Sequence, residues 1–246
     1  MLSFIVPAYN EEHELPATLA AIHSAAEAAA LPYEIVVADD DSTDETAEIA
    51  RHAGARVVPV RRRQIAAARN AGARAARGNV FFFVDADTRI TSTHVIEAVE
   101  VLNAGVAGGS ARVAIGEEIP RWARIFVYLF SKIYFAANLG AGAFLFTSRD
   151  FFERAGGFDE QYFAGEEIYF SQALKKLGRF TLLSEPVVTS GRKLRIYSGR
   201  QILLRSIQIV LGGKGAVRSR AKLDLWYGGR REGTLTARQV ARTESE

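Results

Sequence analysis

The sequence predicts an α/β fold in which helices cover both faces of a mostly parallel central sheet. The first ninety residues alternate between strand-like and helix-like segments, the pattern of right-handed crossovers between parallel strands. The segment 79–84 is almost entirely apolar, with no polar alternation, and is typical of a strand buried on both faces. Acidic or polar residues follow these apolar segments, at the end where open α/β sheets bind ligands.

Each expected element follows from its apolar pattern. In the first half we expect strands at residues 3–8, 33–38, 55–60 and 79–84, with helices near 14–30, 44–53 and 64–77. Further on we expect a helix near 92–103, strands at 106–115 and 141–147, a helix at 165–177 and a strand near 180–189. Segments 122–135 and 201–211 also favour helices. We therefore expect one domain over 1–190 with a basic helical C-terminal extension over 191–246.

The composition is that of a globular protein. The chain has 246 residues, of which 48% are hydrophobic and 24% charged, so a sizeable core is available. The absence of cysteine excludes disulfides and thiolate metal sites. No uncharged apolar segment reaches the roughly 18 residues of a membrane-spanning helix. No basic region followed by an apolar stretch precedes the first strand, so we expect no signal peptide and a cytoplasmic protein.

The net charge of the chain is +3, but the charged residues are distributed unevenly along it. Residues 1–190 hold 18 Lys and Arg against 24 Asp and Glu, a balance of −6, whereas residues 191–246 hold 13 against 4, a balance of +9. A basic tail on an acidic domain favours an anionic partner such as lipid headgroups or nucleotide phosphates, and a solvated tail is the alternative. No recognition motif for nucleic acid is present, so we expect no nucleic-acid partner.

Asp85 and Asp87 directly follow the most apolar of the expected strands. Two carboxylates one residue apart at a strand end suit a divalent cation that also holds the phosphates of a substrate. Asp is also common in solvated turns after strands. The pair alone therefore leaves both interpretations open.

Three further motifs accompany this pair in order along the chain. They are the segments Phe4–Glu12, Glu34–Glu45 and Ala68–Gly72. With Asp85-Ala86-Asp87 they resemble the family 2 glycosyltransferases, whose nucleotide-binding fold is called GT-A. The resemblance covers roughly residues 2–190, and the ordered set is much more specific than any one motif.

The resemblance implies that the strand ends bind the nucleotide of a UDP- or GDP-sugar together with Mg²⁺ or Mn²⁺. Asp87 would be the metal ligand, and Asp85 would contact the ribose or a metal-bound water. A cation is needed because acids alone repel a diphosphate. Asp40 would accept the ring N–H of uracil or guanine. The other implied nucleotide-binding residues are Pro7, Ala8, Tyr9, Glu11, Asp39, Ala86 and Arg69, the last as a cation near the diphosphate.

Two of these assignments have structural alternatives. The acids at 39–41 also suit the N-terminal region of a helix, where the helix dipole favours negative charge. Arg69 could instead form a surface salt bridge.

Glu166 and Glu167 lie where the family carries an acidic pair, usually Glu-Asp, whose second acid is the general base toward the acceptor hydroxyl. The second acid here is glutamate, whose extra methylene moves the carboxylate. We expect Glu167 to be the base, with Glu166 as the other member of the catalytic pair. A base within reach of the hydroxyl and the anomeric carbon permits in-line displacement with inversion. Without the resemblance, two acids at a helix start are ordinary residues favoured by the dipole.

Arg192 and Lys193 follow the last expected strand and resemble a basic position that some relatives place near the diphosphate after a loop closes. Gly191 and Gly199 would permit the movement of such a lid. The aromatic segment 122–135 and the basic extension also suit peripheral attachment to an anionic membrane surface, with a core or dimer contact as the alternative for the aromatic segment.

These features predict an inverting, metal-dependent glycosyltransferase that moves a sugar from a nucleotide-diphosphate donor to a hydroxyl or lipid-phosphate acceptor. A glycan, a lipid-linked acceptor and a small molecule all remain open as acceptors. One alternative is a non-catalytic nucleotide-sugar-binding or scaffold protein. The other is a sugar-phosphate nucleotidyltransferase, which needs a Gly-rich, Arg/Lys-bearing loop after the first strand that residues 9–12 do not provide.

Overall fold

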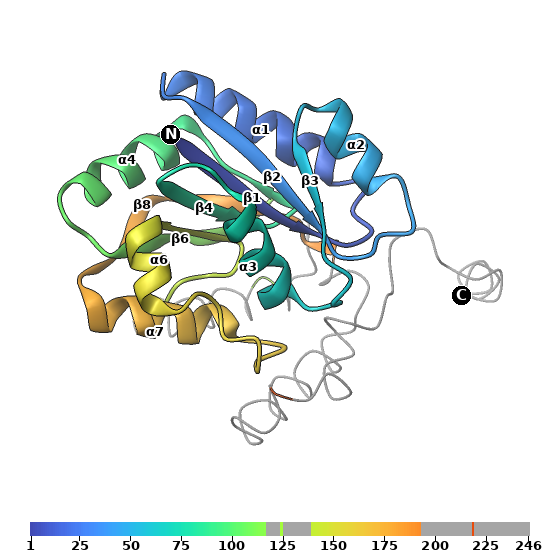
Figure 1. Cartoon of the computed structure of the whole chain (residues 1–246). Helices are drawn as coiled ribbons and strands as arrows, with labels where there is room; N and C mark the ends of the chain where they lie inside the picture. Colours follow the sequence, from blue (N-terminus) through green and yellow to red (C-terminus); the bar gives the residue numbers. More distant parts are fainter. Residues whose placement is uncertain (117–123, 125–138, 193–217, 219–246) are drawn as a thin grey trace.

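The computed structural model describes residues 1–116, 124, 139–192 and 218 (Figure 1). These residues form an eight-stranded sheet of order β3-β2-β1-β4-β7-β6-β8-β5. The strands are β1 (Leu2–Ala8), β2 (Tyr33–Asp39), β3 (Arg56–Pro59), β4 (Val80–Val84), β5 (Thr88–Arg89), β6 (Gly108–Ile115), β7 (Phe144–Ser148) and β8 (Phe180–Thr189). The helices are α1 (Leu15–Ala28), α2 (Thr46–His52), α3 (Ile65–Ala75), α4 (Ser92–Asn103), α6 (Arg149–Ala155) and α7 (Glu166–Leu177).

The first half of the chain builds a parallel sheet centred on β1. This strand pairs in parallel with β2 and β4, and β2 pairs in parallel with β3. Ala8 lies opposite Asp39, and Ile5 lies opposite Phe83. The carboxyl ends of β1, β2 and β4 therefore share one edge, as the alternation of strands and helices predicts.

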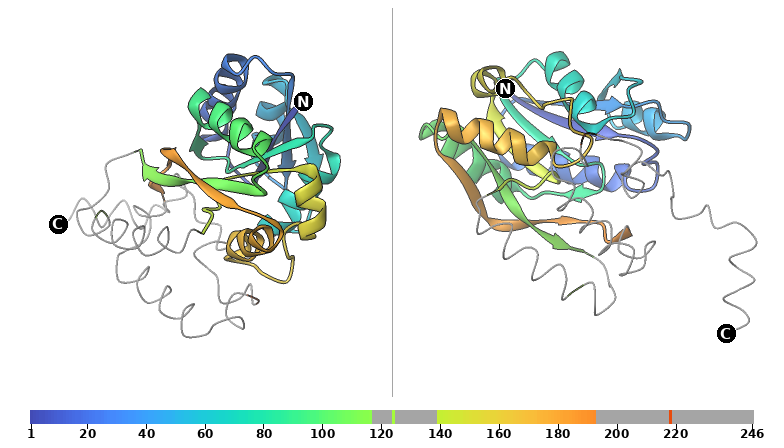
Figure 2. Two further views of the ribbon diagram at one scale, coloured as in Figure 1. Left: turned by 90° about the vertical axis from the view of Figure 1, so that its left-hand side faces the viewer. Right: turned by 90° about the horizontal axis from the view of Figure 1, so that it is seen from below.

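The second half of the sheet is mixed. β7 pairs antiparallel with both β4 and β6, while β6 pairs in parallel with β8. Figure 2 shows β6 and β8 side by side at this end of the sheet. The short β5 pairs antiparallel with β8, so that Thr88 lies opposite Thr189. This pairing brings the end of β8 to the turn that follows β4.

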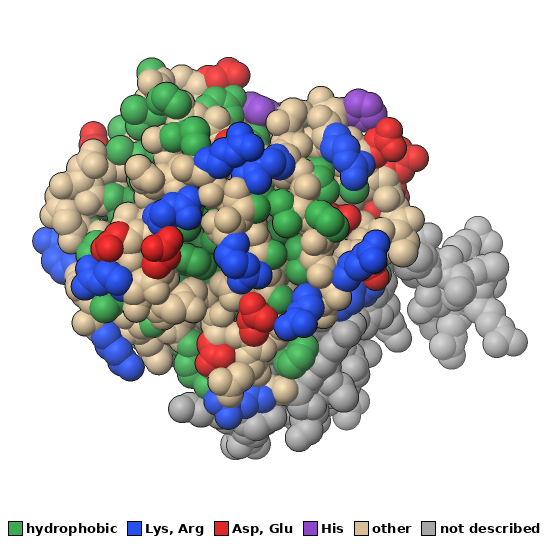
Figure 3. Space-filling model, viewed as in Figure 1, with side chains coloured by type: hydrophobic (Ala, Val, Ile, Leu, Met, Phe, Trp, Pro, Cys, Tyr) green, Lys and Arg blue, Asp and Glu red, His purple; other side chains and the backbone are tan. Residues whose placement is uncertain are grey.

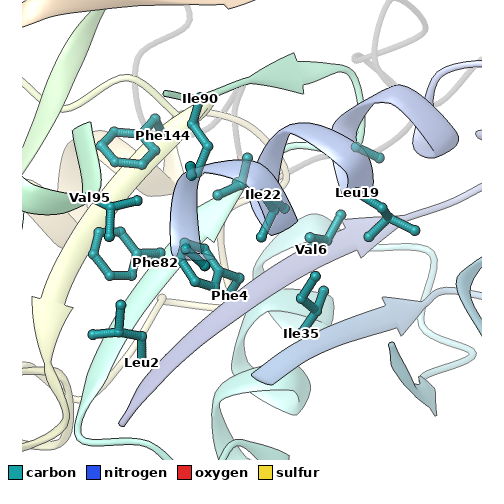
Figure 4. Packing of buried hydrophobic residues seen from close by; sticks show 14 of the residues in the cluster. Leu2, Phe4, Val6, Leu19, Ile22, Ile35, Phe82, Ile90, Val95 and Phe144 are labelled. Atoms are coloured by element: carbon teal, nitrogen blue, oxygen red, sulfur yellow. The ribbon is translucent and has the colours of Figure 1, made fainter. Parts of the chain in front are cut away.

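One face of the sheet is covered by α1, α2 and α4 (Figure 1). The residues of this layer that are labelled in Figure 4 are Leu2, Phe4, Val6, Leu19, Ile22, Ile35, Phe82, Ile90, Val95 and Phe144. Phe4 and Phe82, from adjacent strands, are fully buried and stack with ring centroids 4.9 Å apart. Removing this much apolar surface from water is the main stabilising contribution of the layer.

The other face is covered by α3, α6 and α7. Phe81 and Phe83 of β4 point to this side because alternate residues of a strand face opposite ways. The ring of Phe83 contacts those of Phe158 and Phe170, with centroids 4.9 and 6.2 Å away. β4 is thus buried on both faces, as its uninterrupted apolar sequence predicts.

Helix α3 approaches β1 very closely at Gly72. A Cβ at this position would lie 2.5 Å from Cγ2 of Ile5, so only glycine fits without displacement. Arg69 lies about one turn earlier on the same helix. The close packing therefore sets the height of Arg69 above the sheet.

Most expected elements are confirmed, with ends shifted by a few residues. Two were missed: the two-residue β5 and helix α6. Helix α6 follows β7 without a loop, and the Oγ of Ser148 caps it by accepting from Phe151 N at 3.3 Å. It ends at Ala155 and is capped by Gly156, whose φ of 81° is left-handed. Segments 122–135 and 201–211 and most of the extension 191–246 lie outside the described residues.

In the part of the chain that the structure describes, no helix combines the length and the apolar character needed to cross a bilayer. On the face shown in Figure 3, Lys and Arg side chains are interspersed with Asp and Glu. The described residues of this face thus present mixed charge rather than one basic patch.

Candidate active site

The loops after β1 and β2 are tied to each other at the carboxyl edge of the sheet. Asp40 N donates to Ala8 O at 2.8 Å. Glu11 N donates to Thr46 Oγ1 at 2.8 Å, which joins the first loop to the start of α2. Two motifs that lie about thirty residues apart in sequence therefore form one surface.

The turn formed by Asp85, Ala86 and Asp87 is held by elements on both sides. Thr18 of α1 donates from Oγ1 to Ala86 O at 2.7 Å. Thr189 of β8 donates from Oγ1 to Oδ1 of Asp87 at 3.2 Å. Both carboxylates are half-buried, whereas Ala86 is buried. The turn thus presents two oriented acids at the edge where β1 and β2 also end.

Asp87 suits a hard divalent cation by the chemistry of its donors. Among the described residues, no group of three or more His, Cys, Asp and Glu side chains could hold a metal. A site of one or two carboxylates fits Mg²⁺ or Mn²⁺ when water and substrate phosphates complete the coordination. Asp87 and its neighbour Asp85 are the carboxylates that could hold such a cation at this edge.

Arg192 reaches the same edge from the end of β8. Its Nη2 donates to Oε1 of Glu11 at 2.9 Å, and the two side chains are only 8% and 12% exposed. Burial opposes the charge of Arg192, but the hydrogen bond and charge of Glu11, with Asp87 and Glu14 nearby, raise its pKa. Lys193, the other predicted lid residue, lies outside the described residues.

The carboxylate of Asp40 is engaged by the main chain. Its Oδ1 accepts from the backbone N–H groups of Arg62 and Arg63 at 2.6 and 2.7 Å. Its Oδ2 accepts from Gln64 N at 2.6 Å. Arg61 and Arg63 have φ values of 56° and 50°, which are unusual for residues other than glycine. Asp40 therefore holds a strained loop that leads into α3.

Asp39 and Tyr9 lie beside Asp40 at the strand ends, and both are half-buried. Asp39 accepts from Ser42 N at 3.3 Å through Oδ1. The guanidinium carbon of Arg63 lies 3.2 Å from the centroid of the Tyr9 ring, a cation–π contact. Of the two neighbouring acids, Asp39 has fewer main-chain donors around its carboxylate.

Arg69 is the centre of a buried cluster of charges. It is 1% exposed, and its Nη1 donates to Oε1 of Glu166 at 2.6 Å. Its Nη2 donates to Oδ1 of Asp85 at 2.9 Å and to Gly142 O at 2.8 Å. Arg69 therefore does form salt bridges, but they are buried and not at the surface as the alternative prediction had it.

The two acids that begin α7 have different surroundings. Glu166 is 4% exposed and pairs with Arg69, whereas the neighbouring Glu167 is half-buried. Burial, and next the charge of Glu166, raise the pKa of Glu167 to about 8, although Arg69 acts in the opposite direction. A carboxyl group that titrates near neutral pH is suited to exchange protons with a hydroxyl group.

Two structural residues of this site were not singled out from the sequence. Asn70 donates from Nδ2 to Phe158 O at 2.8 Å and accepts from Phe158 N at 2.9 Å. Gln64 donates from Nε2 to Glu160 O at 2.5 Å. Both hold the loop that leads to Glu166. Asn70 lies within one of the four motifs, which was the available signal, whereas the sequence offers no signal for Gln64.

The comparison with protein families decides the assignment. The family model described as Glycosyl transferase family 2 matches residues 3–161. The chain belongs to this family. The match includes the strand-end motifs and ends before Glu166 and Glu167, so it does not extend to the acidic pair at α7.

Curated relatives of this family 2 chain match it over part of their length. The 4,4'-diaponeurosporenoate glycosyltransferase of Staphylococcus haemolyticus is 35% identical over 105 residues, 40% of this chain and 27% of that protein. An uncharacterized glycosyltransferase of Mycobacterium bovis is 33% identical over 126 residues, 50% of this chain and 55% of that protein. The dolichol-phosphate mannosyltransferase of Pyrococcus furiosus is 34% identical over 128 residues, which are 49% of this chain and 36% of that protein. The matched regions thus span about a quarter to just over half of these relatives.

Solved structures support the fold. S. aureus TarS in complex with UDP matches with a TM-score of 0.59 at 18% identity, covering 86% of this chain and 65% of that one. A second match is glucosyl-3-phosphoglycerate synthase from Mycobacterium tuberculosis, in complex with Mn²⁺, UDP and glucosyl-3-phosphoglycerate. Its TM-score is 0.58 at 19% identity, and the match covers 95% of this chain and 82% of that one. The predicted GT-A fold is confirmed. At these identities the likeness concerns the fold alone.

The predicted site residues fall into groups according to what they can offer a ligand. Partly exposed residues at the strand edge are Tyr9, Glu11, Asp39, Asp85 and Asp87, although the side chain of Glu11 is only 12% exposed. Pro7 and Ala8 are buried in β1, and Ala86 is buried in the turn. These three residues could therefore contact a ligand only through their main-chain atoms. Arg69, Glu166 and Glu167 form a second group, joined to the first through Asp85.

Proposed function

We propose that this chain is an inverting glycosyltransferase that moves a sugar from a UDP- or GDP-sugar to a hydroxyl or lipid-phosphate acceptor. The observation that carries the proposal is the position of Glu167. This carboxyl group, with its raised pKa, lies beside Arg69, which also binds Asp85 at the donor edge. This link supports the proposal that Glu167 and the strand-end acids act in one site.

On the donor side, we propose that Asp39 accepts the ring N–H of the base and that Tyr9 lies against the base. The resemblance to the family implies Asp40 for this role, but the oxygens of Asp40 already accept three backbone N–H groups. Tyr9 carries Arg63 on its ring, so a base that stacks there would displace or share this contact. Asp85 would contact the ribose from its fixed place at the end of β4.

Asp87 would hold Mg²⁺ or Mn²⁺, with Asp85 as the nearby second acid. Such a cation, when bound, offsets the negative charge that develops on the leaving diphosphate. The charge of Arg192 already interacts with that of Asp87, and Arg192 would add positive charge at the diphosphate after releasing Glu11. The solved structures of relatives with Mn²⁺ and with UDP or GDP-mannose support this choice of cofactor and donor class.

At the acceptor side, we propose that Glu167 removes the proton from the acceptor hydroxyl. Deprotonated Glu167 is required for this step, so activity should rise with pH through the pKa of about 8. Glu166, which is paired with Arg69, is less suited because its carboxylate already carries a strong ion pair. The names of relatives that act on dolichol phosphate and undecaprenyl phosphate support a lipid-phosphate acceptor.

The first experiment is a thermal-shift screen of UDP- and GDP-sugars with and without Mn²⁺, because ligands that bind the native state raise its apparent stability. The donor that shifts the transition most is then tested for transfer to hydroxyl and polyprenyl-phosphate acceptors. Product stereochemistry by NMR decides between inversion and retention.

Variants then separate an enzyme from a binding protein. Asp87→Asn and Glu167→Gln should each lower the transfer rate by at least about 100-fold, whereas Glu167→Gln should retain donor binding. Matched controls are Asp150→Asn and Glu153→Gln, two exposed acids on α6. If both site variants transfer sugar as fast as the controls, the assignment of Asp87 and Glu167 to the active site is wrong. If the wild-type chain binds a donor but never transfers, the alternative of a non-catalytic binding protein is favoured.

A further inference from the structure

Arg69 has no surface left to offer a ligand. Its side chain is 1% exposed, and its two terminal nitrogens donate to Glu166, Asp85 and Gly142 O at 2.6–2.9 Å. Its Nε is buried and has no hydrogen-bond partner among the described residues. The resemblance to the family implied a cation near the diphosphate, but this guanidinium points into the protein.

The three partners of Arg69 come from three different parts of the fold. Asp85 ends β4 at the donor edge, Glu166 begins α7, and Gly142 lies in the segment before β7. The hydrogen bond to Glu166 spans 97 positions in sequence. A planar guanidinium can orient two carboxylates at once, which a lysine ammonium cannot do with the same geometry.

We propose that Arg69 is a positioning residue that couples the donor edge to the catalytic helix α7. By binding Glu166 and Asp85 together, it fixes the first turn of α7 and so places the carboxylate of Glu167 next to the donor site. This inference rests on the proposed role of Glu167 as the base. It assigns Arg69 a function through other residues rather than through contact with the diphosphate.

The surroundings of Glu167 support this role. Besides Glu166 on its own helix, the charged groups that act on it are Arg69 from α3 and Asp85 from the end of β4. Glu166 and Asp85 raise the pKa of Glu167, and Arg69 lowers it. The charge of Arg69 thus opposes the effects of burial and of the neighbouring acids on the pKa of Glu167. Nearby, a Cβ on Gly142 would lie 3.1 Å from Arg69 Nη2 and 3.8 Å from Cδ of Glu167, so these groups pack closely.

The test uses three variants of the whole chain: Arg69→Lys, Arg69→Met and Glu166→Gln. Arg69→Lys keeps the positive charge but loses the planar guanidinium that binds Glu166 and Asp85 together. We therefore expect kcat to fall by about 100-fold, while the Kd for UDP or GDP with Mn²⁺ changes less than about fivefold. The pKa of Glu167 is measured directly by carbon-13 NMR of labelled glutamate, assigned with Glu167→Gln. Arg69→Met should raise this pKa and Glu166→Gln should lower it.

The opposite direction of these two shifts separates positioning from a merely structural role. A matched control is Arg56→Met, since Arg56 also pairs with a carboxylate, Glu34 at 2.9 Å, but lies at the other end of the strands. It should leave the titration of Glu167 unchanged, whatever it does to stability. Where Arg69→Met does not fold, Arg69→Lys and Glu166→Gln still give both the rate and the titration.

Three outcomes distinguish this inference from the proposed function. If wild type transfers sugar but Arg69→Lys retains its kcat, the inference is overturned and the function stands. If Arg69→Lys instead loses donor binding by more than about 100-fold at unchanged kcat, Arg69 acts on the diphosphate and the inference is overturned. If Glu167→Gln keeps full activity, the proposed base is wrong, and the NMR shifts still show whether Arg69 controls the titration of Glu167.

Discussion

Arg192 Nη2 donates to Glu11 Oε1 at 2.9 Å and so joins the residue after β8 to the loop after β1. The two residues are 181 positions apart, and both side chains are largely buried. The ion pair thus links the end of β8 to the loop after β1, at the strand edge that also carries Asp87. The charge of Asp87 also acts on Arg192 and helps to raise its pKa.

The pair should contribute measurably to stability. Arg192→Ala removes the ion pair between Arg192 and Glu11 from a largely buried site, so we expect the free energy of unfolding to fall by about 1–2 kcal/mol. Urea unfolding of Arg192→Ala, Glu11→Gln and the double variant gives the coupling energy between the two side chains. Additive effects would mean that the contact contributes nothing and would contradict the prediction.

The neighbouring acids Asp39 and Asp40 should respond in opposite ways to substitution. Asp40→Asn removes the charge that holds three backbone N–H groups, so we expect a loss of about 2–4 kcal/mol in unfolding free energy. Asp39→Asn should change stability little but weaken nucleotide binding about tenfold, because it loses a charged acceptor for the base. Urea unfolding and calorimetric titration with UDP and GDP measure the two effects. The reverse pattern would restore Asp40 as the base-binding residue.

Glu167 should make stability depend on pH. Its pKa is raised from the ordinary 4.5 to about 8, so between these values the folded chain holds a proton that the unfolded chain releases. The contribution of this group is therefore fully present below about pH 4.5 and is lost as pH rises through about 8. We expect a decline of roughly 1 kcal/mol per pH unit in that window.

Glu167→Gln lacks this titration and provides the comparison. Relative to the wild type it should gain stability as pH rises, with the difference levelling off above the pKa of Glu167. Urea unfolding from about pH 5 to about pH 9 measures it, with Glu153→Gln as the exposed control. Parallel pH profiles of wild type and Glu167→Gln would show that the pKa of Glu167 is not raised.

Gly142→Ala should affect the reaction more than the fold. The added methyl group would press on Arg69 Nη2 from 3.1 Å, and small displacements of this group are transmitted to α7. We expect kcat to fall about tenfold with a donor KM close to that of wild type. Gly116→Ala is the matched control, because its added methyl meets mainly the exposed side chain of Val188. Equal activity of both variants would show that the contact is tolerated.

Much of the fold could be predicted because its signals are local. The apolar segments of β1, β2 and β4 have no polar alternation, and acids follow two of them directly. Helix α6 escaped prediction because it follows β7 without a loop, and its start was marked only by the capping residue Ser148. The short β5 escaped because two residues carry too little pattern to be recognised.

The amino-acid sequence by itself determined the α/β architecture and the presence of acids at the strand ends, since apolar periodicity and strand-end composition are properties of neighbouring residues. Only the tertiary structure decided how adjacent acids differ. Asp40 and Glu166 are engaged by a loop and by Arg69, while Asp39 and Glu167 are left beside them at the edge of the site. These differences depend on partners that lie 22 and 97 positions away, so no local pattern in the chain records them.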